Sequence, residues 1–197
     1  MANRTVSTAV SIHGTNPQYL VDKIIRQRIY DSLYWKEHCF ALTVTGVMEK
    51  AVDLQCIGGC YGGNSRPSEF LCLVLKLLQL QPDREMVDEL IQQSDFKYLR
   101  ALAMFYLRLT ESSVEIYRKL EPMFKDSRKL RKRTKDGTYE LTYVDELADQ
   151  LLREQWICDV TLPRVSKRIA LEDIGELSPR ISPLEEDSDD ENGMDED

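Results

Sequence analysis

Apolar residues recur at helical spacing along most of the chain, and this pattern predicts a protein built mainly of α-helices. The first helix is expected to begin at Pro17 with Asn16 as its N-cap, because an asparagine N-cap followed by proline is typical of a helix start. Its apolar face carries Leu20, Val21, Ile24, Ile25 and Ile29. The same spacing predicts helices over residues 43–54, 68–80, 82–91, 95–109, 112–120, 142–152 and 165–177.

One predicted helix is apolar on nearly all sides. Within residues 70–80 the apolar run is interrupted mainly by Lys76 and Gln79. Such a helix belongs at the centre of a bundle, where neighbours cover every face. Because the connections after it are short, the following helices should pack beside it, mostly antiparallel. The predicted fold class is therefore all-α, a compact multi-helix bundle.

One segment breaks the helical pattern. Residues of alternating character flank Asp136-Gly137, a dipeptide that favours a two-residue hairpin turn, so we expect one short β-hairpin here. Residues 125–135, the basic segment, hold seven bases opposed only by Asp126: Lys125, Arg128, Lys129, Arg131, Lys132, Arg133 and Lys135. No aromatic residue within the segment is available to stack a base. Two interpretations stay open, a solvated helix end and a phosphate-binding patch.

The last residues differ from the rest in composition. Ser178-Pro179 and Ser182-Pro183 mark a linker, and residues 184–197 contain nine acids and no base, without which the formal net charge of −8 becomes +1. We expect a helical domain over residues 1–178 and a proline-punctuated, disordered acidic tail over residues 179–197. Ser188 lies among these acids and is a candidate phosphorylation site.

Residues 58–64, the glycine-rich loop, contain four glycines within six residues. Glycine permits left-handed backbone angles and close approach, so this is a shaped loop. No Gly-Lys-Ser/Thr follows and the glycine spacing does not fit a dinucleotide fingerprint, which argues against nucleotide binding. The loop is either a tight connection between helices or a platform that presents Tyr61 and Asn64 to a partner.

The sequence supplies no recognisable catalytic or metal-binding set. His13 and His38 are its only histidines, and neither has partners at the spacing of a known triad or metal motif. The spacing of Cys56 and Cys60 is uncommon for structural zinc. An odd count of five cysteines without an apolar leader favours reduced thiols, and no apolar run reaches the length of a membrane span. We therefore expect no enzyme activity, cofactor, metal or small-molecule substrate.

Several motifs, taken together, resemble the pre-mRNA-splicing factor 38 family. The two most specific are Ser11-Ile12-His13-Gly14-Thr15-Asn16-Pro17-Gln18-Tyr19-Leu20 and Gly58-Gly59-Cys60-Tyr61-Gly62-Gly63-Asn64. They are joined, in family order, by Tyr34-Trp35-Lys36-Glu37, Phe70-Leu71-Cys72-Leu73, Asp95-Phe96-Lys97-Tyr98 and Leu120-Glu121-Pro122. The resemblance extends over about residues 1–187.

The resemblance implies a nuclear, non-enzymatic scaffold of the precatalytic spliceosome, associated with the tri-snRNP and required for spliceosome activation. The partners it implies are tri-snRNP components, a microfibrillar-associated-protein-type factor and a small zinc-finger splicing factor. We expect Tyr61, Asn64 and Arg66, with Tyr19 and Trp35 nearby, to form a partner site, since aromatic and arginine side chains dominate interfaces. Tyr19 and Trp35 are equally explained as core residues. The alternative function is direct RNA binding through the basic segment.

Overall fold

The computed structural model describes residues 3–180. The chain divides into two compact units, Met1–Val165 and Ser166–Asp197. The predicted boundary near residue 178 falls inside the second unit and stays a prediction. The predicted disordered acidic tail and the candidate phosphorylation site Ser188 lie outside the described residues.

The N-terminal part of the chain forms two short helices where one was predicted. Asn16 caps a 3-10 helix η1 (Pro17–Leu20), and its side chain accepts a hydrogen bond from the Gln18 backbone N–H. The backbone is extended at Val21, and α1 (Lys23–Asp31) begins only after this break. A π-helical turn η2 (Trp35–Cys39) follows. The prediction of helical structure from the apolar spacing is therefore confirmed, but the prediction of one continuous helix was wrong.

The central helices agree closely with the sequence pattern. They are α2 (Val44–Val52), α3 (Glu69–Leu80), α4 (Arg84–Gln92), α5 (Lys97–Thr110) and α6 (Ser113–Leu120). The side chains of Thr43, Ser68 and Ser112 each accept a hydrogen bond from the first turn of the helix that follows. A 3-10 turn η3 (Glu121–Lys125) continues from α6.

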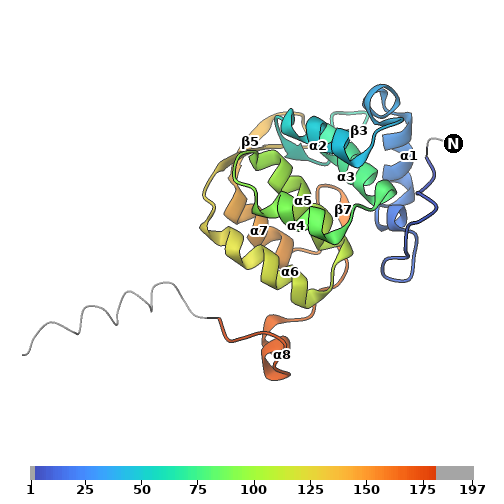
Figure 1. The fold of residues 1–197 in the computed structure, drawn as a ribbon. Coiled ribbons are helices and arrows are strands. Elements are labelled where there is room, and N and C mark those ends of the chain that lie inside the picture. Colours follow the sequence, from blue (N-terminus) through green and yellow to red (C-terminus); the bar gives the residue numbers. More distant parts are fainter. Residues whose placement is uncertain (1–2, 181–197) are drawn as a thin grey trace, which may run out of the picture. The chain divides into compact units, whose positions relative to one another are not determined.

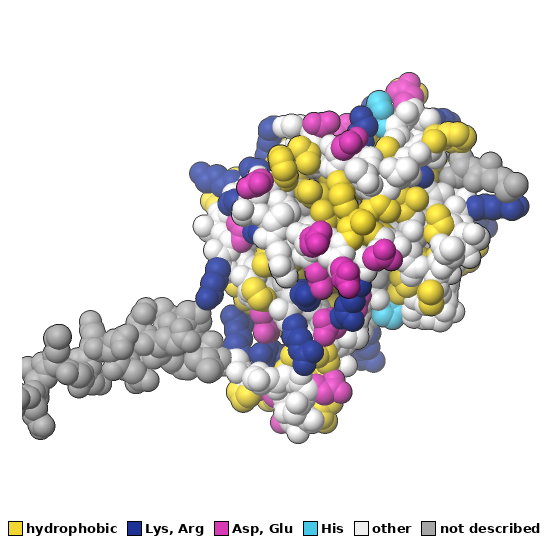
Figure 2. Space-filling model, viewed as in Figure 1, with side chains coloured by type: hydrophobic (Ala, Val, Ile, Leu, Met, Phe, Trp, Pro, Cys, Tyr) yellow, Lys and Arg dark blue, Asp and Glu magenta, His cyan; other side chains and the backbone are white. Residues whose placement is uncertain are grey.

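Helices α3 and α5 form the centre of the first unit (Figure 1). Nearly every residue of both is buried, and Phe70 meets Phe105 edge to face with ring centroids 5.6 Å apart. Around them pack α2, α4 and α7 (Val144–Arg153). Figure 2 shows acidic and basic side chains side by side over α4 and α6, where Lys119 lies 2.8 Å from Asp88. The predicted central position of the apolar helix is confirmed.

The strands are more numerous than the single predicted hairpin. That hairpin is β4 (Lys129–Arg133) with β5 (Tyr139–Tyr143), and β1 (Ile57–Gly58) joins β4 in parallel. Two further antiparallel pairs are β2 (Cys60–Tyr61) with β3 (Arg66–Pro67) and β6 (Trp156–Ile157) with β7 (Val160–Thr161). Two-residue strands are too short to leave an alternating pattern, which is why the sequence did not reveal them.

The turn of the β4–β5 hairpin is one residue longer than predicted. Arg133 pairs with Tyr139, and Thr134 pairs with Thr138 through a 3.0 Å backbone hydrogen bond. Gly137 takes φ +86°, as in a three-residue loop that ends in a glycine bulge. Shifting the register by one residue turns each side chain to the other face of the ribbon. A two-residue turn would place Glu140 opposite Arg133, whereas the structure places Tyr139 there.

The helix predicted over residues 142–152 begins at Val144. A capping box precedes it, in which the Glu146 carboxylate accepts from the Tyr143 backbone N–H at 3.2 Å and from the Thr142 hydroxyl at 2.8 Å. The second unit contains α8 (Arg168–Asp173), which is shorter than the predicted helix over residues 165–177. Gly175 at φ +75° follows it, an angle that ends a helix readily. Within residues 3–180, no helix is long and apolar enough to cross a membrane.

Candidate functional site

The glycine-rich loop lies at the junction of three strand pairs. A Cβ atom on Gly58 would lie 3.1 Å from the Arg133 carbonyl oxygen of β4. A Cβ atom on Gly59 would lie 2.6 Å from the Cys158 carbonyl carbon in the turn between β6 and β7. The glycines therefore allow segments that are far apart in sequence to pack backbone against backbone.

The turn between β6 and β7 is fastened to this loop by a side chain. Cys158 and Asp159 take φ values of 52° and 61°, the left-handed angles that a two-residue hairpin turn requires. The Asp159 carboxylate accepts a 2.5 Å hydrogen bond from the Cys60 backbone N–H. An aspartate tolerates the left-handed region better than most residues and here also supplies the acceptor.

Three of the predicted partner residues lie on the β2–β3 ribbon that leaves the loop. Tyr61 pairs with Arg66, and Asn64 is exposed in the turn between them. The Arg133 guanidinium carbon lies 4.2 Å from the centroid of the Tyr61 ring. The Gly62 backbone N–H donates a 2.7 Å hydrogen bond to the Lys135 carbonyl. The structure therefore joins the glycine-rich loop and the basic segment, which the sequence presented as separate features, into one surface.

The other two predicted partner residues have opposite environments. Tyr19 is 60% exposed, and Arg26 stacks on its ring at 4.2 Å. Trp35 is only 2% exposed; its ring contacts Tyr30, and its indole N–H donates to Asn3 Oδ1 at 3.0 Å. Trp35 is therefore a core residue, the second of its two interpretations, and its buried ring does not face a partner.

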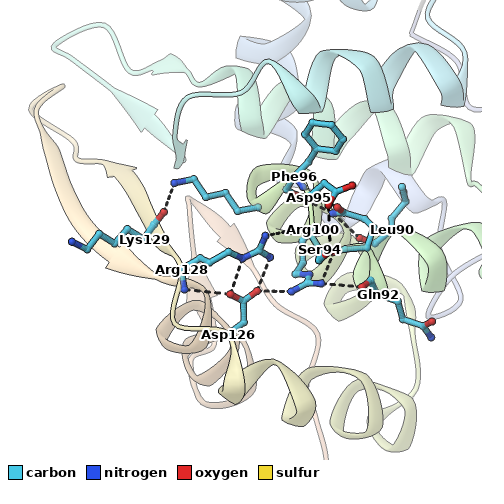
Figure 3. A network of polar contacts seen from close by, with 11 residues as sticks. Leu90, Gln92, Ser94, Asp95, Phe96, Arg100, Asp126, Arg128 and Lys129 are labelled. Carbon is cyan, nitrogen blue, oxygen red and sulfur yellow. Dashed lines mark hydrogen bonds and ion pairs between the residues drawn. The ribbon is translucent and has the colours of Figure 1, made fainter.

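The basic segment was predicted as a single patch, but its first arginine is part of the fold (Figure 3). Arg128 donates to both carboxylate oxygens of Asp126, at 2.8 and 2.7 Å, and to the Ser94 carbonyl. The same carboxylate accepts from Arg100 of α5 at 2.5 Å. Arg100 also donates to the Gln92 carbonyl at 2.9 Å. These bonds tie the hairpin to the end of α4 and the start of α5.

The electrostatics of Asp126 agree with this structural role. Burial alone would raise the pKa of its carboxyl group, but hydrogen bonds from Arg128 and Arg100 outweigh the burial and lower that pKa to about 2. The pKa of Arg128 is raised, chiefly by its hydrogen bond to Asp126. A charge-assisted network of this kind is already satisfied, so Arg128 is not available for a phosphate.

The remaining cations of the segment are different. Among residues 3–180, none of them forms an ion pair; they are Lys125, Lys129, Arg131, Lys132, Arg133 and Lys135. Lys125 ends η3, as the interpretation as a helix end expects, whereas the other five lie on or beside β4, where that interpretation was wrong. A strand presents successive side chains on opposite faces, which places Arg131 and Arg133 on one face.

Aromatic rings accompany these cations, although none lies within the segment itself. Arg133 lies between Tyr61 and Tyr139, with its guanidinium carbon 4.2 and 4.9 Å from the two ring centroids. Lys135 Nζ lies 5.0 Å from the centroid of Trp156. We call the set of Tyr61, Arg131, Arg133, Lys135, Tyr139 and Trp156 the basic-aromatic surface. Tyr139 and Trp156 were not predicted as site residues. The position of Tyr139 opposite Arg133 depends on the strand register of the hairpin, which Asp136-Gly137 did not determine.

Two hollows flank the hairpin. One, of about 450 Å³, lies between the glycine-rich loop, β4 and β6, and its lining includes Lys132, Arg133, Lys135 and Trp156. The other, of about 460 Å³, lies between α2, α5 and the hairpin, and we call it the apolar groove. Its lining includes the exposed hydrophobic residues Val52, Phe96 and Leu141. Three cations and one acid also line it: Lys97, Lys129, Arg131 and Asp95. Figure 2 shows hydrophobic side chains exposed on the viewed face between the positions of α2 and α4.

The cysteine side chains are buried or half-buried, whereas His13 and His38 are exposed. Burial raises the pKa values of Cys39 and Cys158 to about 12 each, which keeps both thiols protonated and weakly nucleophilic. The His13 Nε2 atom lies 3.1 Å from the Leu109 carbonyl oxygen. In the part of the chain that the structure describes, no cluster of three or more His, Cys, Asp or Glu side chains is arranged to hold a metal ion.

These features define a class: a helical domain that offers binding surfaces built on strands and loops. The chain belongs to the PRP38 family, whose model matches residues 10–175. It is 54% identical over 196 residues to pre-mRNA-splicing factor 38 of Drosophila melanogaster, and 54% identical over 190 residues to pre-mRNA-splicing factor 38A of Homo sapiens. These matches cover 100% and 96% of the chain but only 59% and 61% of the two relatives.

A solved structure has the same fold. It is a chain in the crystal structure of the Snu23-Prp38-MFAP1(217-258) complex of Chaetomium thermophilum. The TM-score is 0.85 and the sequence identity 41%, with 93% of this chain and 97% of that chain covered.

Proposed function

We propose that the chain is a non-enzymatic protein-interaction scaffold of the precatalytic spliceosome, associated with the tri-snRNP and required for spliceosome activation in the nucleus. The observation that carries the proposal is the match at 41% identity, over nearly the whole of both chains, to a protein crystallised in a complex with Snu23 and MFAP1. Membership of the PRP38 family supports the same conclusion.

The proposed partners are a microfibrillar-associated-protein-type factor, a small zinc-finger factor of the Snu23 type and components of the tri-snRNP. The apolar groove suits one of these proteins. The groove contains exposed hydrophobic side chains whose burial against a partner is energetically favourable: Val52, Phe96 and Leu141. The cations Lys97, Lys129 and Arg131 line the same groove. This chemistry fits a partner helix with an apolar face and acidic flanks.

A non-catalytic role is consistent with the side-chain chemistry. The thiols that burial keeps protonated do not act as nucleophiles. The left-handed backbone angles of Cys158 and Asp159 instead form a turn that holds two surface ribbons together through the hydrogen bond to Asp159. A rigid platform of this kind lowers the ordering cost of binding.

The direct test measures binding of the full chain to an MFAP1-type segment and to a Snu23-type protein by isothermal titration calorimetry. We expect both to bind, and the double variant Phe96→Ser/Leu141→Ser to weaken one of them by at least about tenfold, because buried hydrophobic anchors dominate interface energies. The matched control is Ile24→Ser/Leu33→Ser, which removes two hydrophobic side chains on and after α1 that are at least as exposed as Phe96 and Leu141.

Two results would contradict different parts of the proposal. If neither protein bound the unchanged chain, the scaffold function would be wrong. If both bound but the groove variant behaved like the control, only the assignment of the groove would be wrong. Adding the purified chain back to a depleted splicing extract tests activation itself, where we expect the extract without it to stall before catalysis.

A further inference from the structure

We infer that the basic-aromatic surface, which shares Arg131 with the apolar groove, binds single-stranded RNA. Three cations of this surface lack the acidic partner that several other cations of the described residues have. Arg84, Arg100, Lys119, Arg128 and Arg153 each have a carboxylate partner within 4 Å. Arg131, Arg133 and Lys135, by contrast, have no acidic partner among residues 3–180.

The acids near these three cations come from other elements than the hairpin face that carries Arg131 and Arg133. That face is shared with Tyr139, Leu141 and Tyr143, because cross-strand partners share a face, and none of these residues is acidic. The neighbouring hollow is lined by three acids: Glu140 from the opposite face of β5, Glu154 after α7, and Asp159, whose carboxylate accepts from the Cys60 backbone N–H. The apolar groove is lined by one, Asp95.

The aromatic rings decide between two kinds of anion. Tyr139 is 45% exposed and Trp156 is 49% exposed, so each ring has an open side as well as a cation near it. Cations beside open rings match a ligand that alternates phosphates with flat, apolar bases. A duplex hides its bases within the stack, so the surface selects an unpaired strand.

The Arg133 side chain is held in place by two rings. Its guanidinium carbon lies 4.2 and 4.9 Å from the centroids of the Tyr61 and Tyr139 rings, and one of its terminal nitrogens donates a hydrogen bond to the Tyr139 hydroxyl. A phosphate oxygen is the kind of acceptor that a preorganised arginine takes best.

The test uses the full chain and a fluorescein-labelled, mixed-sequence single-stranded RNA of about 12 nucleotides, a length within the range that one such surface covers. Fluorescence anisotropy gives the affinity as a function of salt. The double variant Arg131→Gln/Lys135→Gln should weaken binding and make the dependence of log K on log salt shallower by about 0.7 per lost contact. The control, Lys23→Gln/Lys36→Gln, removes the same charge from exposed lysines elsewhere.

A second pair of variants tests the rings without changing charge. Tyr139→Leu/Trp156→Leu should weaken binding by at least about tenfold, while Tyr19→Leu, also an exposed ring beside an arginine, should leave it unchanged. Circular dichroism and thermal unfolding of each variant establish that it is folded. Three results would overturn the inference: no binding at low salt, equal losses in the lysine control, or duplex RNA and a polyglutamate peptide binding as well as the single strand.

Discussion

Two arginines three residues apart, Arg128 and Arg131, show how one basic segment serves two purposes. Arg128 donates to both oxygens of the buried Asp126 carboxylate and fastens the hairpin to α4 and α5. Arg131 lies on the exposed face of β4, 5.6 Å from the Tyr139 ring, with no acidic partner among residues 3–180. Arg128 stabilises the fold, whereas Arg131 is available to a ligand. A basic residue in a sequence therefore does not by itself mark a binding site.

The largest difference in stability should come from removing the Asp126 carboxylate, which Arg100 and Arg128 share. Asp126→Asn leaves Arg100 and Arg128 with a neutral acceptor in a site where the carboxylate is only 11% exposed. We expect a loss of about 3 kcal/mol in the free energy of unfolding, typical of breaking a buried ion pair. Urea denaturation measures it. The control Asp149→Asn, in an exposed pair with Arg153, should change stability by less than about 0.5 kcal/mol.

The same carboxylate predicts an acid-sensitive part of the stability. The pKa of Asp126 is about 2 in the fold, below its ordinary value of 3.8, so the charged form stabilises the fold above about pH 4 and the contribution disappears as pH falls through about 2. It amounts to about 2.5 kcal/mol. The stability difference between the unchanged chain and Asp126→Asn should therefore shrink as the pH falls from 6 to 2. A constant difference would show that Asp126 does not carry this pH dependence.

A smaller effect is expected in the loop that joins the two surface ribbons. Gly59→Ala would force a methyl group against the backbone of Cys158, at a cost of about 1.5 kcal/mol. Gly63→Ala, in the same loop, meets nothing within 4 Å and should be nearly neutral. Thermal unfolding of both variants provides the comparison, and equal midpoints would mean that the loop does not pack as described.

The smallest effect should come from the exposed cations. Arg131→Gln/Lys135→Gln removes two charges that make no ion pair with the described residues, so the free energy of unfolding should change by less than about 0.5 kcal/mol. Urea denaturation of this variant beside Asp126→Asn contrasts the two halves of the basic segment. A loss above about 2 kcal/mol would assign these cations to the fold instead of to a ligand.

The helices could be predicted from the sequence because each carries a long apolar pattern and a clear cap. Ser68, for example, is the N-cap of α3. The residues that follow it are apolar on nearly all sides, which predicts the central position of that helix. The break at Val21 could not be predicted, because the apolar spacing continues across it. The strands β1, β2, β6 and β7 are two residues long and exist only through contacts with distant segments.

The candidate site was predictable in its parts but not in its assembly. The glycine-rich loop, with Tyr61, and the basic segment both stand out in the sequence. Their union depends on the close approach of Gly58 to Arg133, and the place of Tyr139 depends on a turn one residue longer than Asp136-Gly137 suggests. Trp35 was misplaced because a tryptophan gives no indication in sequence of whether its ring faces the core or the solvent.

The central claim is that the chain is a salt-resistant protein scaffold in spliceosome assembly. The most direct measurement purifies the full chain with its associated factors from nuclear extract, washes at moderate and then high salt, and identifies the proteins retained by mass spectrometry. We expect MFAP1-type and Snu23-type proteins to stay bound at high salt, because buried apolar contacts carry their binding, while RNA is released. Recovery of no splicing protein at either salt concentration would contradict it.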